Sequence, residues 1–402
     1  MNKGTAIKRI FILVFDSLGV GALPDAAAYG DAGANTLGHV AEAAGGLALP
    51  TLQSLGIGNI IDIEGVPPAD KPLGGYGRLT EISHGKDTTV GLWEMMGVVT
   101  ATPFPVFPQG FPPDVVDRFV AATRCGGVLG NKAASGTDII DELGAEHMRT
   151  GRPIVYTSGD SVWQIAAHES VVPVERLYEM CLAARGILTG ALGVDRVIAR
   201  PFIGQAGSFV RTERRKDFGL APDAKMTLDY AATAGVDVIG IGKVSDVFSG
   251  RGITKSVKTK DNGAALAETT RLAERGGRGI VFTILGDFDT LWGHRNDVAG
   301  YSKGLVEADK KLGRLLAALT NDDVLMIVAD HGCDPTLPGT DHTREYVPLL
   351  VYGKSLKSGV ALGTRTSMSD VGKTVADLLG FGAPVPGISF SNDILESQRS
   401  AR

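Results

Sequence analysis

Three motifs in the C-terminal part of the chain carry residue types that are typical of a metal site. GDFDTLWGHRND holds Asp289 and His294, VLMIVADHGCDPT holds Asp330 and His331, and GTDHTREYVPLL holds His342. Carboxylate oxygen and imidazole nitrogen, without thiolate, suit a divalent ion such as Mn²⁺ or Zn²⁺. Each motif alone is also a common turn sequence, because Asp and Gly favour turns. Together they contain three of the seven histidines of the chain, which favours the metal site.

Asp16 in FVFDSLG is a further candidate ligand, because it ends an apolar run that is typical of a buried strand. A buried carboxylate needs a compensating cation or several hydrogen-bond donors, although it can also serve as a helix or turn cap. Three Asp and three His carry a charge of −3, and two divalent ions carry +4. The site is therefore expected to be slightly positive and to accept a phosphate or an alkoxide.

A candidate nucleophile lies in HGKDTTVGLWEMMG, where a glycine-led, charged turn precedes an apolar segment. A threonine hydroxyl is unreactive at neutral pH unless a base or a metal lowers its pKa, and the predicted ions can do this. The alternative is a capping box in which a threonine begins the following helix. The pattern does not distinguish Thr88 from Thr89.

Buried strands and amphipathic helices alternate in the segments that must position these residues. Apolar runs predict strands at Ile10–Phe15, Val236–Ile241, Gly279–Leu285, Val324–Val328 and Leu349–Tyr352. Helical spacing predicts helices at Ala264–Arg275 and Tyr301–Leu319. This alternation predicts an α/β fold with a mainly parallel sheet, whose strand ends gather ligands. Asp16, Asp289 and Asp330 all stand at or just past such ends.

The middle of the chain has a different composition. Ala101–Pro113 is rich in Pro and Phe and reads as a linker or hinge, and Gly204–Pro222 is rich in Arg and Gly and reads as a loop. We therefore expect a discontinuous catalytic core of residues 1–103 and 222–402. An inserted, smaller α/β cap domain should occupy residues 104–221.

Composition excludes several classes of protein. The chain has 402 residues and a formal net charge of −5 with no long run of one sign, which argues against nucleic-acid and anionic-membrane partners. No apolar run approaches the ~20 residues of a membrane span. The three cysteines, Cys125, Cys181 and Cys333, are far apart and form no C-x-x-C pair, so reduced thiols and a cytoplasmic protein are expected.

Several segments are long and specific enough to compare with a known family. They are FDSLGVGALPDA near the start, GKDT at Gly85–Thr88, YTSGDSVWQIAAHE at Tyr156–Glu169, ARPFIG at Ala199–Gly204, DFDTLWGHR at Asp287–Arg295, and ADHGCDPT with GTDHTREYVPLLVY. With these motifs the chain resembles, over nearly its whole length, the phosphopentomutases of the alkaline phosphatase superfamily. The resemblance implies an alkaline-phosphatase-like core with an inserted cap.

The resemblance also implies site roles. The first metal would be held by Asp16, Asp330 and His331, and the second by Asp289, His294 and His342. The ions would most often be Mn²⁺. Thr88, rather than Thr89, would be the phosphorylated residue, and a sugar bisphosphate would prime it.

The implied reaction interconverts ribose 1-phosphate and ribose 5-phosphate, and the corresponding 2-deoxyribose pair. Its substrates are small pentose phosphates, whose distal phosphate needs cations. Arg200, Arg215 and Lys243 can supply these, and Ser158 and Asp160 can contact sugar hydroxyls. Alone, each of the three cations could equally be a solvated surface charge.

Two positions depart from the pattern that the resemblance implies. Leu92 stands in GLWE where His is usual, and Cys333 stands in HGCDP where Asn is usual. Two alternatives to a mutase therefore stay open: a metal-dependent phosphatase or phosphodiesterase of the same superfamily, and an inactive metal-binding homologue. The sequence does not indicate the preferred pentose, the physiological metal or the oligomeric state.

Overall fold

The computed structural model describes residues 7–396, which form two compact units. One unit comprises the described residues up to Thr102 and from Pro222 onward, and the other comprises Pro103–Ala221. The sequence-based division lies at 103/104 and 221/222. What each unit does, as catalytic core or as cap, stays a prediction here.

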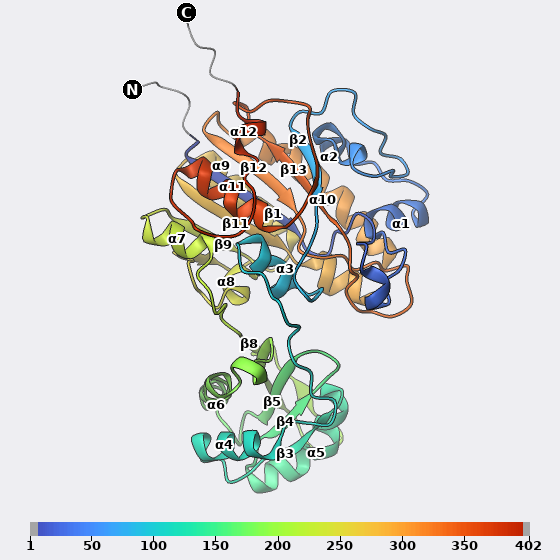
Figure 1. Ribbon diagram of the computed structural model, residues 1–402. Coiled ribbons are helices and arrows are strands. Elements are labelled where there is room, and N and C mark those ends of the chain that lie inside the picture. Colours follow the sequence, from blue (N-terminus) through green and yellow to red (C-terminus); the bar gives the residue numbers. More distant parts are fainter. Residues whose placement is uncertain (1–6, 397–402) are drawn as a thin grey trace, which may run out of the picture. The chain divides into compact units, whose positions relative to one another are not determined.

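The first unit is built on an eight-stranded sheet within residues 7–396 (Figure 1). In order across the sheet, the strands are β10 (Lys255–Val257), β9 (Val238–Ile241), β11 (Gly279–Leu285), β1 (Arg9–Phe15), β12 (Asp323–Val328), β13 (Val347–Tyr352), β2 (Gly75–Leu79) and β14 (Val360–Arg365). The first five strands run parallel, whereas β13 is antiparallel to both of its neighbours. The mainly parallel α/β fold is thus confirmed.

The central strands end level with one another, which places their following residues at one edge. All seven residues of β1 are buried, as are those of β11 and β12, because helices cover both faces. Phe15 of β1 pairs with Leu285 of β11, and Val14 pairs with Val328 of β12. The segments after β1, β11 and β12 therefore begin side by side.

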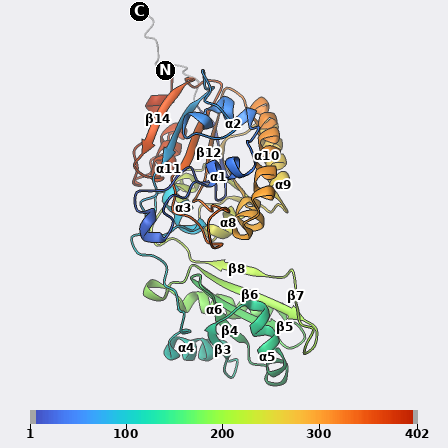
Figure 2. The ribbon, with the colours of Figure 1, turned by 90° about the vertical axis from the view of Figure 1, so that its right-hand side faces the viewer.

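Helices cover both faces of this sheet. They are α1 (Thr36–Ala43), α2 (Pro50–Leu55), α3 (Thr88–Met95), α7 (Thr227–Thr233), α8 (Val244–Val247), α9 (Asn262–Arg275), α10 (Val298–Ala318), α11 (Ser369–Leu379) and α12 (Ser391–Ile394). Figure 2 shows α9 and α10 on one face and α11 on the other, and α7 contacts α11. The predicted strands and helices of this unit are confirmed, with shifts of at most three residues at their ends.

The second unit has its own sheet and two small hydrophobic cores. Its strands are β3 (Leu129–Ala133), β4 (Ile154–Thr157), β5 (Val162–His168), β6 (Arg196–Ile203), β7 (Val210–Arg211) and β8 (Lys216–Gly219). Helices α4 (Pro113–Thr123) and α6 (Val174–Ile187) pack on one face, and α5 (Gly136–Thr150) packs on the other. None of the helices in residues 7–396 is long and apolar enough to span a membrane.

The linker predicted at Ala101–Pro113 is wrong in its second half. The stretch forms neither helix nor strand before α4, as its prolines require. Phe111, however, is only 3% exposed, and its ring lies 4.4 Å from that of Trp163 in the core of the second unit. Proline content indicates where regular structure is absent, but it does not exclude burial of the phenylalanines between the prolines.

The loop predicted at Gly204–Pro222 is also partly wrong. It contains β7 and β8, which both pair antiparallel with β6. The first residues of these strands, Val210 and Lys216, are both exposed to solvent. β7 has two residues and β8 has four, which is too short for the alternating apolar pattern by which strands are identified in a sequence.

A buried histidine gives the second unit a testable pH dependence. His147 at the end of α5 has its Nδ1 2.7 Å from the carbonyl oxygen of Arg152, and its Nε2 accepts from the His168 N–H at 2.8 Å. Burial lowers the pKa of His147 below its ordinary value of 6.5. The unfolded state therefore binds a proton first as the pH falls, so this stabilisation is present above pH 6.5 and is lost below it.

Hydrogen exchange of β5 peptides checks this prediction. After correction for the intrinsic pH dependence of exchange, protection of the His168 amide should fall by up to about tenfold per pH unit below pH 6.5, because one proton is linked to opening. His147→Asn should remove this additional pH dependence. An equal dependence in both proteins would contradict it.

Candidate active site

Asp16, Asp330 and His331 meet at the carboxyl ends of β1 and β12. Asp16 directly follows β1, and Asp330 follows β12 by two residues. Asp16 and Asp330 are 0% exposed, and His331 is 1% exposed. His331 Nε2 lies 3.5 Å from Asp16 Oδ1 and 3.4 Å from Asp330 Oδ2. These two carboxylate oxygens have no hydrogen-bond partner among the described residues, and with His331 they form a group that could hold a metal ion.

A strained residue helps to hold this group. Ser17 has φ 76°, in the left-handed region that side chains other than glycine rarely adopt. In this conformation its N–H donates to Asp330 Oδ1 at 3.1 Å, and its hydroxyl lies 3.2 Å from that of Tyr301. One residue therefore joins the ends of the two strands that carry the ligands, a use for which backbone strain is often retained.

Asp289, His294 and His342 form the second group. Asp289 lies in a π-helical turn, η4 (Phe288–Trp292), and His294 lies in the next turn, η5 (Gly293–Arg295). His342 comes from the segment before β13. Both Nε2 atoms approach Asp289 Oδ1, at 3.2 Å from His294 and 3.1 Å from His342. The structure thus brings all six predicted ligands close together. Among the described residues, the sets whose ligand atoms all lie within 4.8 Å of one another are Asp16, Asp330 and His331; Asp289, His331 and His342; and Asp289, His294 and Cys333.

The carboxylates have strongly shifted pKa values. Burial, together with the neighbouring Asp330, raises the pKa of Asp16 well above its usual value, and burial raises the pKa of Asp330 to about 7. Burial acts in the same sense on Asp289, but the hydrogen bond and charge of His342, with Lys243, hold the pKa of Asp289 well below its usual value. Bound cations would resolve this conflict between burial and charge.

Thr88 lies beside the first group. It is the first residue of α3, and the helix is capped by Asp87, whose carboxylate accepts from Thr89 N and Val90 N. The alternative in which a threonine is the N-cap is therefore wrong. Thr88 Oγ1 lies 3.1 Å from His331 Nε2, whereas Thr89 is buried. This geometry favours Thr88 as the nucleophile.

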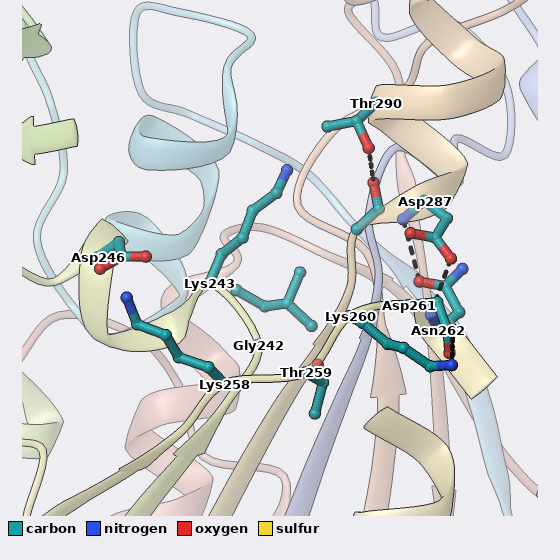
Figure 3. Close-up of a pocket in the computed structure, with 12 residues that line it drawn as sticks. Gly242, Lys243, Asp246, Lys258, Thr259, Lys260, Asp261, Asn262, Asp287 and Thr290 are labelled. Atoms are coloured by element: carbon teal, nitrogen blue, oxygen red, sulfur yellow. Dashed lines mark hydrogen bonds and ion pairs between the residues drawn. The ribbon is translucent and has the colours of Figure 1, made fainter. Parts of the chain in front are cut away.

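Lys243 lies next to both metal groups. Its Nζ is 3.3 Å from Asp16 Oδ2 and 3.9 Å from Asp289 Oδ2. The Lys243 side chain is 40% exposed, and the two carboxylates raise its pKa although partial desolvation acts to lower it. Lys243 lines a cavity of about 270 Å³, together with Gly242, Gly286 and the start of α9. Figure 3 shows Lys243 and Gly242 among the residues around this cavity. Lys243 therefore belongs to the first unit, whereas Arg200 and Arg215 lie in the second.

Arg200 and Arg215 belong to a cluster of cations around Tyr156. Arg200 donates to Gln164 at 3.0 Å, and Arg215 makes two hydrogen bonds of 2.7 Å to Asp217. The Tyr156 hydroxyl is buried, and burial raises its pKa although Arg200, Arg211 and Arg215 act to lower it. Arg211 is a member that sequence reasoning missed. It stands in the same RTERRKD segment as Arg215, so its motif was the available signal.

Ser158 and Asp160 lie in the turn between β4 and β5 of the second unit. The Asp160 N–H donates to the Ser158 hydroxyl at 3.3 Å, and Asp160 is exposed. The two side chains are therefore available to a ligand.

The two departures from the expected pattern have different surroundings. Leu92 is fully buried one turn after Thr88 in α3. Cys333 is also buried, and its Sγ lies within 4.8 Å of ligand atoms of Asp289 and His294. A thiol therefore lies beside the candidate ligands, although the predicted ligand set contains none. Burial raises the pKa of this thiol well above its usual value.

Comparison with known proteins settles the family. The Metalloenzyme superfamily model matches residues 8–383. Phosphopentomutase from Acetivibrio thermocellus is 56% identical over 389 residues, covering 97% of this chain and 100% of the relative. The chain belongs to the phosphopentomutase family. A second relative, phosphopentomutase from Symbiobacterium thermophilum, is 53% identical over 97% of this chain and 99% of its own length.

Membership of the phosphopentomutase family makes the chain a metalloenzyme of the mutase, or isomerase, class. The fold has a more distant likeness as well. A solved structure of a Pyrococcus horikoshii protein matches with a TM-score of 0.50 at 16% identity, covering 94% of this chain and all of that one. At this identity the likeness concerns the fold alone.

Replacing one ligand tests the first group. Asp330→Asn should reduce the bound divalent metal by roughly one ion per chain, because a neutral amide replaces the anionic carboxylate that would bind the ion. Turnover should be lost with it. Metal analysis by mass spectrometry checks this, with Asp377→Asn as a control that removes one exposed carboxylate. Full metal content in Asp330→Asn would contradict the assignment.

Proposed function

We propose that the enzyme interconverts ribose 1-phosphate and ribose 5-phosphate, and the 2-deoxyribose pair, through a phosphorylated Thr88. The observation that carries this proposal is the position of Thr88 Oγ1, 3.1 Å from His331 Nε2 at the edge of the buried carboxylates. A hydroxyl beside a group of metal ligands can act as a nucleophile, because a bound metal ion would lower its pKa.

The proposed reaction has two transfers. Phospho-Thr88 gives its phosphoryl group to the C1 hydroxyl of ribose 5-phosphate: the bond from phosphorus to Thr88 Oγ1 breaks and the bond to the C1 oxygen forms. The proton of the C1 hydroxyl balances the alkoxide left on Thr88. Thr88 Oγ1 then takes the 5-phosphate of the resulting 1,5-bisphosphate, which releases ribose 1-phosphate. A sugar bisphosphate phosphorylates Thr88 before the first cycle.

The residues present fit two divalent ions. Unpartnered oxygens of Asp16 and Asp330 point to one ion with His331, and the convergence of His294 and His342 on Asp289 points to the other. When bound, such ions, which we propose to be Mn²⁺, would supply Lewis-acid stabilisation of phosphoryl oxygens and a lower pKa for the Thr88 hydroxyl. The nearby Cys333 thiol leaves this choice of metal open to test.

The remaining residues are proposed to position the substrate. Arg200 and Arg215, with Arg211, form a cluster of cations suited to a phosphate. Ser158 and Asp160 offer hydrogen bonds to sugar hydroxyls. Lys243, beside Asp16 and Asp289, would contact the phosphoryl group that is being transferred. A cytoplasmic location is part of the proposal, on the ground of three cysteines without a pair.

Thr88→Ala tests the nucleophile. Turnover of ribose 1-phosphate should fall by ~10³-fold or more, while metal content stays unchanged, because the hydroxyl is the group that carries the phosphate. Thr89→Ala is the matched control and should change turnover little. Peptide mass spectrometry should find the phosphate on Thr88 in the native enzyme. Phosphate on Thr89 would overturn the assignment, and release of free phosphate as the main activity would favour a phosphatase.

Arg200→Ala tests positioning by the cation cluster. We expect kcat/KM for the mutase reaction to fall ~10²-fold, with a smaller change in the slow hydrolysis of phospho-Thr88. The reason is that the cation cluster would orient the sugar phosphate, whereas hydrolysis by water does not need an oriented sugar. The measured quantity is the ratio of mutase to hydrolysis rates. Arg149→Ala, at an exposed arginine of α5, is the control. An unchanged ratio would show that Arg200 is a surface charge.

A further inference from the structure

The segment that leads into Thr88 has no regular secondary structure of its own. Residues 81–87 connect the end of β2 to α3, so their backbone groups must find partners elsewhere. The N–H groups of Ile82 and Ser83 donate to the carboxylate of Glu94, at 3.0 and 2.7 Å. Three carbonyl groups of the segment, those of Glu81, Ser83 and Gly85, accept hydrogen bonds from one arginine.

That arginine is Arg344, which lies two residues after the metal ligand His342. Its side chain is 2% exposed. Its Nη1 donates to the carbonyl oxygens of Ser83 and Gly85, at 2.9 and 2.7 Å, and its Nη2 donates to that of Glu81 at 2.9 Å. Three carbonyls of the segment before Thr88 are therefore bound by a single guanidinium.

Two carboxylates and one ring fix the guanidinium itself. Nη1 donates to Glu81 Oε2 at 2.8 Å, and Nε and Nη2 donate to Asp25 at 3.2 and 3.0 Å. The Tyr29 ring lies 5.0 Å from the guanidinium carbon. All of its N–H groups thus have acceptors, and the planar fork can hold only one orientation.

A second cation joins the same two segments. Lys86 Nζ lies 3.1 Å from Asp31 Oδ2 and 3.3 Å from Asp341 Oδ2, and Asp31 Oδ2 also accepts from the backbone N–H of Arg344. The chain around His342 and the chain before Thr88 are therefore bound together at several points. Arg344 is the buried centre of these contacts.

We propose that Arg344 is a positioning residue: it holds the segment before Thr88 against the segment that carries His342, so that the Thr88 hydroxyl is aimed at the metal ligands. It does this through main-chain carbonyls and does not contact the substrate. The inference rests on the proposed function of Thr88. It identifies which side chain sets the distance between nucleophile and ligands.

The experiment compares two buried arginines in the full-length, metal-loaded enzyme. Arg344→Met removes the guanidinium at similar side-chain length. Arg9→Met is the matched control, because Arg9 is also buried, also binds a carboxylate (Asp323) and two carbonyls, and lies at the start of β1, whereas Asp16 follows its end. Both changes are expected to reduce thermal stability.

Only Arg344→Met should impair phosphoryl transfer in the folded protein. We expect kcat for ribose 1-phosphate to fall ~10²-fold, since misplacement of a reacting group by about 1 Å has this effect. KM and the number of bound metal ions should change little. The rate at which ribose 1,5-bisphosphate phosphorylates Thr88, read by mass spectrometry, should fall in parallel with kcat. Arg9→Met should leave all of these near the native values.

Arg344→Lys keeps the charge without the fork and provides a second variant if Arg344→Met does not accumulate. It should retain an intermediate kcat, since one ammonium can bind only some of the three carbonyls. A native phosphorylation rate in folded Arg344→Met or Arg344→Lys, or an equal loss in Arg9→Met, would overturn the proposal. Absence of phosphate on Thr88 in the native enzyme would instead overturn the proposed function.

Discussion

The buried, like-charged carboxylates of Asp16 and Asp330 are the constraint on which the rest of the site depends. Both residues are fully buried at the ends of neighbouring strands, and each keeps an oxygen without a hydrogen-bond partner in the part of the chain that the structure describes. Burial of an unpaired carboxylate is unfavourable, and the second negative charge adds to the cost. Ser17 N–H and Lys243 compensate only part of it. The divalent cations that we propose to bind here would supply the missing positive charge, and such cations also assist phosphoryl transfer.

The remaining features of the first unit bring Thr88, the proposed nucleophile, to these carboxylates. The level ends of β1, β11 and β12 place the ligand-bearing segments at one edge, and Asp87 starts α3 so that Thr88 faces His331. The segment before Thr88 has no regular secondary structure. Its backbone is bound by hydrogen bonds that Arg344 donates to its carbonyl groups and that Glu94 accepts from its N–H groups. Precise placement of this kind is a large part of the catalysis of phosphoryl transfer, where little covalent chemistry is left to other groups.

Much of this arrangement could be predicted from the sequence, and the physical reasons are particular. β1, β11 and β12 are buried on both faces, so each is a continuous apolar run, and the acidic residues that follow them are conspicuous. The choice between Thr88 and Thr89 could not be made from spacing, because it depends on the contact with His331, a residue 243 positions away. The sequence does not predict the burial of Phe111 or the pairing of β7 and β8 with β6, because proline, glycine and arginine dominate those segments. Arg211 was missed although it stands in the same RTERRKD segment as Arg215, because the segment does not show which of its arginines lie near Tyr156.

The most direct test of the central claim is the metal content of crystals of the native enzyme grown with Mn²⁺ and measured at the manganese absorption edge. The account predicts two anomalous peaks per chain, one bound by Asp16, Asp330 and His331 and the other by Asp289, His294 and His342. Removal of the ions by a chelator should lower the melting temperature, since ligands that bind only the folded state stabilise it. No peak at the buried carboxylates, or a protein equally stable after chelation, would contradict the account.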